Sequence, residues 1–323
     1  LSIGMNRLAV IDKKNGKQPM FSWDKKILCL FNGTIYNFQE LKKFLEKKNV
    51  NFHTNSDTEV LVNSYSYWGD KCFNYFDGMW AVALYNFSNN SIKISRDYLG
   101  QKPLFYTSVG KDKFLFSSQI DGIFKYKYPF EINRLNLKSY YQFGFTPSPN
   151  TIYNKLYQVT PGEIISFKKQ INRKTFWDLT SGADYNIFFK KDNRFKFEKK
   201  FNKILKNYLI ADKKPALTLS SGLDSNILRF ILKKIGVKLK MFTIGFVSKS
   251  FNEIKNLYID KVKDHNIKIM KSSDIKNIFL KLKKKVSFAN SDGSLIPTYF
   301  LFNQIKKKTN VCLGGDGGDE IFF

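Results

Sequence analysis

The stretch 217–226, Leu-Thr-Leu-Ser-Ser-Gly-Leu-Asp-Ser-Asn, constrains the fold of this chain more than any other. The apolar run Ala216–Leu219 predicts a buried strand, and the small residues Ser220–Gly222 predict a turn. Asp224-Ser225 are then expected to open a helix over Asn226–Ile235. Such a strand, turn and helix start form an anion site, because free backbone N–H groups converge there and small side chains let a phosphate approach. An Asp at the rim of a phosphate site indicates that Mg²⁺ lies between them.

A second bend of unusual composition follows the predicted strand Val311–Leu313. Residues 314–320 read Gly-Gly-Asp-Gly-Gly-Asp-Glu, so four glycines and three acids are packed into seven positions. This composition suits neither a core nor a helix start, and it is typical of a backbone that approaches a nucleotide while carboxylates hold Mg²⁺. Between the two bends, Lys240–Phe246 predicts another strand, and a strand–helix–strand order implies parallel pairing by a right-handed crossover. Ligands of such sheets bind at the carboxyl ends of the strands.

Length and composition indicate two domains with ample core, since the chain has 323 residues of which 43% are hydrophobic. No uninterrupted apolar run is long enough to cross a membrane, and the start carries no signal-peptide pattern. Three widely spaced cysteines fit a reducing compartment, with buried thiols expected for Cys29 and Cys312, which lie in apolar runs, and Cys72 as the third. We therefore expect a cytoplasmic protein with no membrane partner.

The net charge of +27 raises the question of a nucleic-acid partner. Only six of the 54 basic residues are Arg, whereas nucleic-acid readers generally use Arg forks at bases and phosphates. The lysines are also scattered along the chain. These features favour a compositional bias of the source genome over a nucleic-acid surface.

The first half of the chain reads as α+β. Helices are predicted over Phe38–Lys47 and Asp57–Tyr67, the first with Phe38, Leu41, Phe44 and Leu45 on one face and the second with Ser56 or Asp57 as its N-cap. Strands are predicted at Ile27–Phe31, Trp80–Tyr85, Ile92–Ser95, Leu104–Tyr106 and Phe114–Phe116. Further along, Ser181–Asn193 has linker composition, Phe195–Leu209 predicts an amphipathic helix, and His265 is expected in a loop.

Ordered motifs along the whole chain resemble the asparagine synthetase family. The stretch 217–226 is similar to the PP-loop of enzymes that split ATP to AMP and pyrophosphate, with Ser221 where that loop usually has Gly. Five strings resemble the glutaminase domain of class II amidotransferases: Arg7–Asp12, Asn32–Asn37, Ser56–Val60, Gly78–Ala81 and Arg96–Leu104. The resemblance implies an Ntn-type αββα glutaminase domain over residues 1–190 and a Rossmann-like PP-loop domain over 191–323. It also implies a fragment that lacks both ends of the family's full length.

For the glutaminase domain, the resemblance implies a site for glutamine. Arg7 fits the α-carboxylate, Asp57 fits the α-ammonium, and Asn32 with the Gly33 N–H fits the oxyanion formed when the amide is attacked. The implied glutamine-binding residues are Arg7, Leu8, Ala9, Val10, Ile11, Asn32, Gly33, Thr34 and Asp57, with Thr34 where the family usually has Glu. Each also has a plain alternative: Arg7 in a surface ion pair, Asp57 as a helix cap, Asn32-Gly33 as a turn.

The family's nucleophile is an N-terminal cysteine whose own amine acts as the base. It would precede Leu1, and none of the three cysteines present can replace it. We therefore expect no glutamate release from glutamine by the 323-residue chain.

For the PP-loop domain, the resemblance implies an ATP site. The implied ATP-binding residues are Leu219, Ser220, Ser221, Gly222, Leu223, Asp224, Ser225, Ile244, Gly314 and Gly315. Ile244 would meet adenine through its backbone, Asp316 would lie at the acyl-adenylate, and Asp224 and Asp319 would hold Mg²⁺ with pyrophosphate. Gly314 stands where the family usually has Ser. Glu253 carries little weight as a site residue, and Asp292 or Ser294 is expected to cap a helix near the acceptor.

The implied function is the glutamine-dependent, ATP-driven amidation of a carboxylate, with aspartate as the typical acceptor and ATP and Mg²⁺ as cofactors. Three alternatives stay open at this point. The first is a sister enzyme that amidates another carboxylate, for example one on a surface sugar. The second is a PP-loop enzyme that acts on tRNA, and the third is a non-catalytic relative. The expected partners are the small substrates, and a homodimer is left open.

Overall fold

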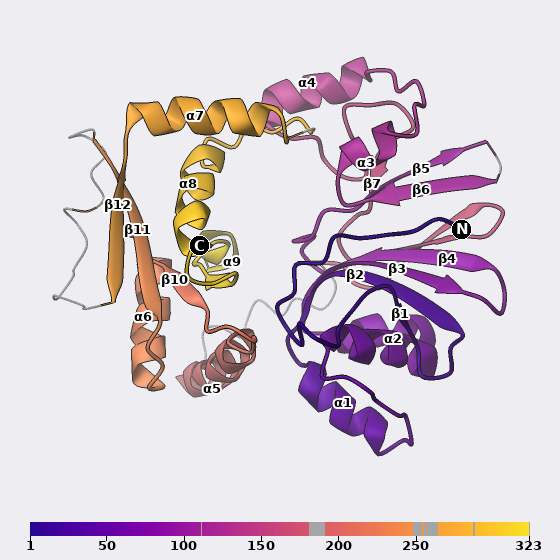
Figure 1. The fold of residues 1–323 in the computed structure, drawn as a ribbon, viewed down its shortest axis with the longest axis horizontal. Helices are drawn as coiled ribbons and strands as arrows, with labels where there is room; N and C mark the ends of the chain where they lie inside the picture. Colours follow the sequence, from indigo (N-terminus) through magenta and orange to yellow (C-terminus); the bar gives the residue numbers. More distant parts are fainter. Residues whose placement is uncertain (111, 181–190, 248–253, 255–263, 287, 323) are drawn as a thin grey trace. The chain divides into compact units, whose positions relative to one another are not determined.

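The computed structural model describes residues 1–110, 112–180, 191–247, 254, 264–286 and 288–322. Its contacts divide the chain into two units (Figure 1). The first comprises Leu1–Arg194 with Ser287–Ser291, and the second comprises Phe195–Val286 with Asp292–Phe323. The boundary at residue 190 expected from the sequence lies outside the described residues and stays a prediction. Residues 191–193, expected in a linker, are already helical, because α5 spans Lys191–Tyr208.

The first unit is built on two antiparallel sheets. The six-stranded sheet has the order β1-β2-β3-β4-β8-β9, and its strands are β1 (Met20–Phe21), β2 (Ile27–Ile35), β3 (Gly78–Asn86), β4 (Ser91–Arg96), β8 (Glu163–Phe167) and β9 (Ile171–Thr175). The three-stranded sheet has the order β6-β5-β7, with β6 (Lys113–Ser117), β5 (Phe105–Val109) and β7 (Tyr157–Gln158). The five strands predicted from alternating patterns are thus all confirmed.

Side chains on the two faces of the larger sheet pack into two separate hydrophobic layers. Ala81, Ala83 and Ile94 pack on one face against Tyr106 of the smaller sheet and Leu104, which directly precedes β5. On the other face, Trp80 stacks on Phe73 of the 3₁₀ segment η1 (Gly69–Tyr75), which also contacts Tyr65. The period-2 alternation of side chains therefore packs the two sheets together and attaches helices to the outer face.

Helices complete the four layers of the first unit (Figure 1). On the larger sheet lie α1 (Phe38–Glu46) and α2 (Asp57–Trp68), and on the smaller sheet α3 (Ile120–Phe124) packs through Ile120 and Ile123 against Phe105. Helix α4 (Arg134–Phe143) follows. The layer order helix, sheet, sheet, helix confirms the αββα class.

Two helix faces differ from their predicted patterns. Phe44 of α1 was expected on the buried face but is 45% exposed, and its ring lies against that of Trp68 at 5.4 Å between centroids. In α2, the helical periodicity predicts one buried face through Val60, Leu61, Ser64 and Trp68, but the helix buries nine consecutive residues, Asp57–Tyr65. Its polar residues are buried with it, which makes the N-terminus of α2 a chemically specialised position.

The second unit is a parallel sheet covered by helices on both faces. The strand order is β12-β11-β10-β13, formed by β12 (His265–Met270), β11 (Lys240–Phe246), β10 (Ala216–Thr218) and β13 (Cys312–Leu313). On one face, α5 and α6 (Leu223–Lys234) contribute Leu205 and Leu232 to a cluster with Leu217. On the other face, α8 (Leu295–Ile305) packs Ile305 against Phe242. Helices α7 (Ser272–Lys283) and α9 (Gly318–Phe322) complete the unit, which confirms the expected Rossmann-like α/β class.

Three local predictions in the second unit are corrected. His265 begins strand β12 and is not in a loop. Helix α6 begins at Leu223, and its N-cap is Gly222 without a side-chain cap bond, so neither Asp224 nor Ser225 opens it. Cys312 is only partly buried, because β13 is an edge strand. Within the described part of the chain, no helix has the length and apolarity needed to cross a bilayer.

Candidate functional site

The strand order of the second unit reverses direction beside β10. From β10 the chain proceeds through α6 to β11 and onward to β12, whereas β13 pairs with β10 on its other side. In open parallel sheets, the crevice at such a reversal, outside the carboxyl ends of the strands, is where ligands bind. The two bends singled out in the sequence follow β10 and β13, so both lie at this crevice.

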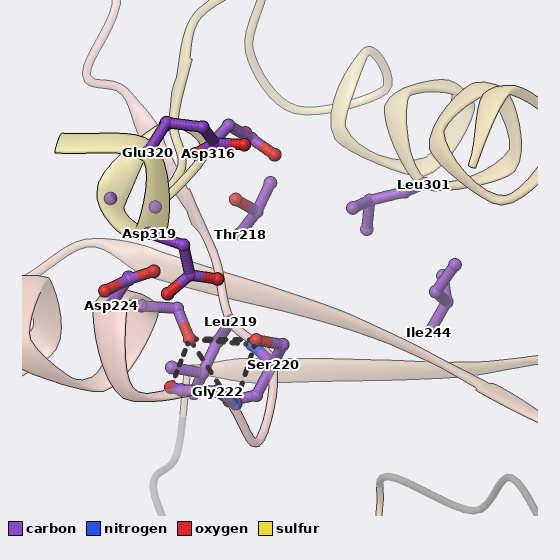
Figure 2. A pocket seen from close by; sticks show the side chains of 14 residues that line it. Thr218, Leu219, Ser220, Gly222, Asp224, Ile244, Leu301, Asp316, Asp319 and Glu320 are labelled. Atoms are coloured by element: carbon purple, nitrogen blue, oxygen red, sulfur yellow. Dashed lines mark hydrogen bonds between the residues drawn. The ribbon is translucent and has the colours of Figure 1, made fainter. Parts of the chain in front are cut away.

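A cavity of about 500 Å³ opens there (Figure 2). Its size suits a nucleotide-sized ligand. It is lined by Thr218, Leu219, Ser220, Gly222, Asp224, Ser225, Ile244, Leu301, Gly315, Asp316, Gly317, Gly318, Asp319 and Glu320. Asp224 and Asp319, which are 95 positions apart in sequence, thus share one cavity.

Of the ATP-binding residues implied by the resemblance, seven line the cavity, and Asp316 and Asp319 join them. Ser221, Leu223 and Gly314 are not among the lining residues, and Leu223 is 61% exposed. The resemblance assigned no individual role to Thr218, Leu301 or Glu320. Thr218 precedes the loop in strand β10, and Leu301 comes from α8, whose packing on the sheet no local pattern reveals.

The bend after β10 is held by a dense hydrogen-bond network (Figure 2). The Ser225 hydroxyl accepts from the Ser220 N–H at 3.1 Å and donates toward the carbonyls of Ser220 and Gly222 at 3.2 Å each. The Asn226 amide donates to the same two carbonyls at 3.1 and 2.8 Å. The carbonyls of Ser220 and Gly222 therefore have side-chain partners, and this bonding fixes the conformation of the loop.

The two bends pack directly on each other. A Cβ placed on Gly315 would lie 2.8 Å from the Asp224 Cβ and 2.9 Å from the Ser225 backbone nitrogen. One placed on Gly318 would lie 2.5 Å from the Asp224 carboxyl carbon. Glycine is therefore required by close approach, and this contact fixes the distance between the acids of the two bends.

The donor set of this cavity fits Mg²⁺ bound together with a phosphate. Asp224, Asp316, Asp319 and Glu320 offer carboxylate oxygens, the ligands that Mg²⁺ prefers. Among the described residues, no group of three His, Cys, Asp or Glu side chains is placed to hold a metal ion by itself.

Behind the cavity, Thr243 ties β11 to β10. Its hydroxyl donates to the Leu219 carbonyl at 2.5 Å and contacts the Nε2 atom of His265 at 2.8 Å. Because Thr243 uses its proton on Leu219, His265 donates to it from Nε2. Burial and the charge of Arg229 lower the pKa of His265, so the imidazole is neutral near pH 7.

In the first unit, Asp57 is the first residue of α2 and is 5% exposed. The N-cap is Ser56, whose hydroxyl accepts from the Thr58 N–H at 3.1 Å, so Asp57 is not itself the cap. Its Oδ2 accepts from the Ile35 N–H at 3.1 Å. Burial raises the pKa of Asp57 to about 6, although the N–H groups of Ile35 and Thr58 and the charge of Arg7 act in the opposite direction.

Arg7 donates to backbone carbonyls of the segment that follows it. Its Nη2 donates to the Ile11 carbonyl at 2.6 Å, and Nη1 and Nη2 both donate to the Asp12 carbonyl at 3.3 Å. The run Leu8–Ile11 is not a strand, and Leu8 is 73% exposed while Ile11 is buried. The run does not join the sheet, and the carbonyl of its last residue, Ile11, accepts from the Arg7 guanidinium.

Asn32 and Gly33 do not form a turn. Strand β2 continues through them to Ile35, with Asn32 opposite Ala81 and Gly33 opposite Trp80. A Cβ on Gly33 would lie 2.0 Å from the Met79 carbonyl oxygen, so only glycine fits. Asn32 is exposed and Thr34 is buried. Strand β2 thus carries the expected oxyanion donors, Asn32 and Gly33, and, two residues after Gly33, the Ile35 N–H that donates to Asp57.

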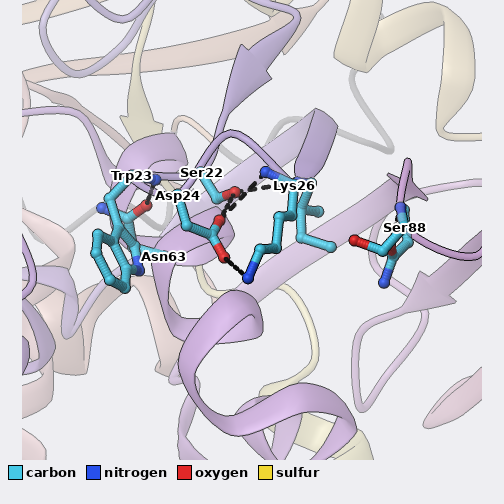
Figure 3. A network of polar contacts seen from close by, with 8 residues as sticks. Ser22, Trp23, Asp24, Lys26, Asn63 and Ser88 are labelled. Atoms are coloured by element: carbon cyan, nitrogen blue, oxygen red, sulfur yellow. Dashed lines mark hydrogen bonds and ion pairs between the residues drawn. The ribbon is translucent and has the colours of Figure 1, made fainter.

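The hairpin before β2 is closed by its own polar network (Figure 3). The Ser22 hydroxyl donates to Asp24 at 2.5 Å and accepts from the Ile27 N–H at 3.0 Å. The side chain of Asn63, on α2, accepts from the Trp23 N–H at 2.8 Å. These bonds attach the hairpin to the helix whose first residue is Asp57.

Comparison with known proteins matches each half of the chain to a described family. Residues 1–177 match the family model described as a glutamine amidotransferase domain, and residues 196–323 match the family model described as asparagine synthase. The chain is 30% identical, over 336 residues, to asparagine synthetase [glutamine-hydrolyzing] 1 of Bacillus subtilis, covering 100% of this chain and 51% of that protein. It is 31% identical, over 352 residues, to putative asparagine synthetase [glutamine-hydrolyzing] 2 of Methanocaldococcus jannaschii, covering 100% of this chain and 66% of that protein.

A solved structure titled as the allosteric regulatory enzyme of purine biosynthesis matches with a TM-score of 0.37 and 14% identity, covering 92% of this chain and 71% of that one. We draw nothing further from that likeness. A glutaminase-type αββα unit joined to a nucleotide-type parallel sheet defines the class of two-domain amidotransferases. The chain belongs to the family of glutamine-hydrolysing asparagine synthetases, and it spans 51% and 66% of the length of the two relatives named above.

Proposed function

We propose that the protein containing this chain amidates a carboxylate at the expense of ATP, with glutamine as the nitrogen source and L-aspartate as the acceptor. One observation carries the proposal: the serine-rich bend after β10 and the glycine-acid bend after β13 enclose a single cavity. Family membership supports the reaction type. The acceptor is inferred from the names of the relatives.

In this proposal, the second unit binds ATP in the cavity at the ends of β10 and β13. The backbone of Ser220–Gly222 cradles the phosphates, and Ile244 lies where adenine would be met. Asp224 and Asp319 would hold Mg²⁺, which neutralises charge that develops on the departing pyrophosphate. Asp316 lies at the acceptor's activated carboxyl group. The acceptor carboxylate attacks the α-phosphorus, pyrophosphate leaves, and ammonia then displaces AMP to give the amide.

The first unit supplies the nitrogen. Arg7 binds the α-carboxylate of glutamine, and Asp57 binds its α-ammonium. Asn32 and the Gly33 N–H stabilise the oxyanion formed at the side-chain amide. Thr34 is buried in β2 and places a neutral hydroxyl in this region. Ammonia stays neutral and nucleophilic as long as water is kept from protonating it.

Product analysis on the full-length protein tests this proposal. The protein is incubated with ATP, Mg²⁺, aspartate and either glutamine or ammonium, and asparagine, AMP and pyrophosphate are measured by mass spectrometry. We expect all three products in equal amounts. Pyrophosphate release that depends on a different carboxylate would identify a sister enzyme, and no release with any acid tested would identify a non-catalytic relative. The tRNA-modifying alternative is not favoured, because the matched families are an amidotransferase and an asparagine synthase.

A further inference from the structure

Asp12 adopts a backbone conformation that needs support from its surroundings. Its φ is +45°, in the left-handed region, which a residue with a Cβ enters at a cost and which Asp tolerates when its side chain bonds locally. The Asp12 Oδ1 accepts from the Asn15 N–H at 3.1 Å, and Oδ2 accepts from the Asn55 N–H at 2.9 Å. Its carbonyl accepts from the Gly16 N–H at 2.9 Å as well as from Arg7.

These bonds join the two residues assigned to the α-carboxylate and the α-ammonium of glutamine. On one side, the Asp12 carbonyl accepts from Nη1 and Nη2 of Arg7. On the other side, its carboxylate holds the Asn55 N–H, two residues before Asp57. Asn55 is 43 positions away in sequence, so this bond is a tertiary link and not a feature of a local turn. Asp12 therefore connects Arg7 directly to the segment that leads into α2.

The loop that starts at Asp12 is packed between the same two elements. A Cβ on Gly16 would lie 2.5 Å from Nη2 of Arg7 and 2.8 Å from the Ser56 hydroxyl. The Arg7 guanidinium and Ser56, the N-cap of α2, thus both lie close to Gly16. We therefore expect a change in the Asp12 turn to shift Gly16 and, with it, the separation of Arg7 from the start of α2.

We propose that Asp12 is a positioning residue that sets the distance between Arg7 and Asp57, and so the fit of the α-carboxylate and α-ammonium of glutamine. The inference rests on the proposed glutamine site. Those two substrate groups are attached to the same carbon, so their binding groups must be spaced to match. Misplacement by about 1 Å is enough to weaken such recognition severely.

A carboxylate suits this role better than an amide. Two backbone N–H groups point at two different oxygens of Asp12, whereas Asn would offer one acceptor oxygen and one donor. Burial acts to raise the pKa of Asp12, but the bonds from Asn55 and Asn15 outweigh it, and the pKa is lowered. The side chain is therefore ionised throughout the physiological range.

Binding of L-glutamine to the 323-residue chain, measured by calorimetry, tests the inference. Asp12→Gly keeps the left-handed backbone and removes both acceptors, and we expect its Kd to rise about tenfold or more. Asp12→Asn keeps one acceptor and is expected to fall between this variant and the wild type. The matched control is Asp24→Asn, another carboxylate that accepts hydrogen bonds within a turn of the same unit, and its Kd should not change.

The outcomes separate the inference from the proposed function. If the wild-type chain does not bind L-glutamine, the proposed glutamine site fails, and the inference fails with it. If the wild type binds and Asp12→Gly binds equally well, or loses only thermal stability, the inference alone is overturned. A double-mutant cycle with Arg7→Ala adds a readout that a structural role would not move. We expect the effect of Asp12→Gly to shrink in the Arg7→Ala background, and additive effects would contradict the inference.

Discussion

At the scale of single residues, Asp57 is a buried acid whose charge opposes folding. Burial raises its pKa from an ordinary 3.8 to about 6, so the folded state binds the proton more tightly than the unfolded state does. Stability is then lost as the pH rises from about 4 to 6, and the full cost is present above pH 6. A residue retained at such a cost at the N-terminus of α2 is consistent with a role in binding a cationic group.

Asp57→Asn should therefore stabilise the protein near neutral pH while abolishing glutamine binding. The raised pKa corresponds to roughly 3 kcal/mol, and we expect the free energy of unfolding at pH 7.5 to rise by about 1–3 kcal/mol. The gain should vanish below pH 4, where both states are protonated. Denaturant titrations from pH 4 to 8 measure it.

Asp24→Asn provides a control of opposite sign. Although burial acts to raise the pKa of Asp24, the Ser22 hydroxyl and the Lys26 N–H lower it on balance. The charge of Asp24 stabilises the fold at pH values above the pKa that Asp24 has in the unfolded state. This contribution disappears as the pH falls through the pKa of Asp24 in the folded state. The variant should be less stable than the wild type at pH 7.5. A stability gain in both variants, or in neither, would contradict this account.

The three cysteines are unsuited to nucleophilic attack. Burial raises the pKa of all three thiols, and the nearby charges of Asp57, Asp70 and Asp316 add to this at Cys29, Cys72 and Cys312 respectively. Since the thiolate is the reactive form, we expect slow alkylation of the folded chain by iodoacetamide at pH 7.5, with the partly exposed Cys312 reacting first. Peptide mass spectrometry over time measures the order. Rapid labelling of Cys29 in the folded chain would be inconsistent with its burial.

At the scale of elements, the cavity depends on the close approach of two bends. Gly315→Ala places a methyl group 2.8 Å from the Asp224 Cβ and 2.9 Å from a backbone nitrogen, so the bends must separate. We expect ATP·Mg²⁺ to bind about tenfold or more weakly, with the loss measured by calorimetry. Gly293→Ala is the matched control, because a Cβ there meets nothing within 4 Å. Equal affinity in the two variants would show that the contact does not shape the site.

Strands with apolar runs were predictable from the sequence, whereas β12, an edge strand with mostly exposed residues, was not. Strands β2 to β6 carry apolar runs that pack on a neighbour, so their patterns identify them. Strand β12 is exposed at four of its six positions, Asn266–Ile269, and is held by backbone pairing to β11. Pairing through the backbone leaves no mark on the side-chain pattern, which is why His265 was assigned to a loop.

At the scale of the whole molecule, the two units hold separate cores. Ile94 is fully buried between the sheets of the first unit, and Leu217 is 1% exposed in the parallel sheet of the second. We expect calorimetry to show two unfolding transitions. Ile94→Ala and Leu217→Ala should each lower one of them, by about 2–4 kcal/mol of stability in the unit concerned.

Each ligand should stabilise only the unit to which it binds. L-glutamine should raise only the transition that Ile94→Ala lowers, and ATP·Mg²⁺ only the other, because a ligand stabilises the unit that binds it. A single transition that both substitutions shift equally would show that the units unfold together.

The sequence by itself determined the local chemistry: two bends of small and acidic residues after apolar strands, and the order of motifs that places the chain in its family. This is possible because backbone conformation and anion affinity are local properties of glycine, serine and aspartate at particular positions. The tertiary structure alone decided which distant residues meet. Strand β13 lies beside β10, which brings Gly315 against Asp224, and burial beneath β2 raises the pKa of Asp57. Contact and desolvation depend on the packing of elements far apart in the chain, and no local pattern encodes them.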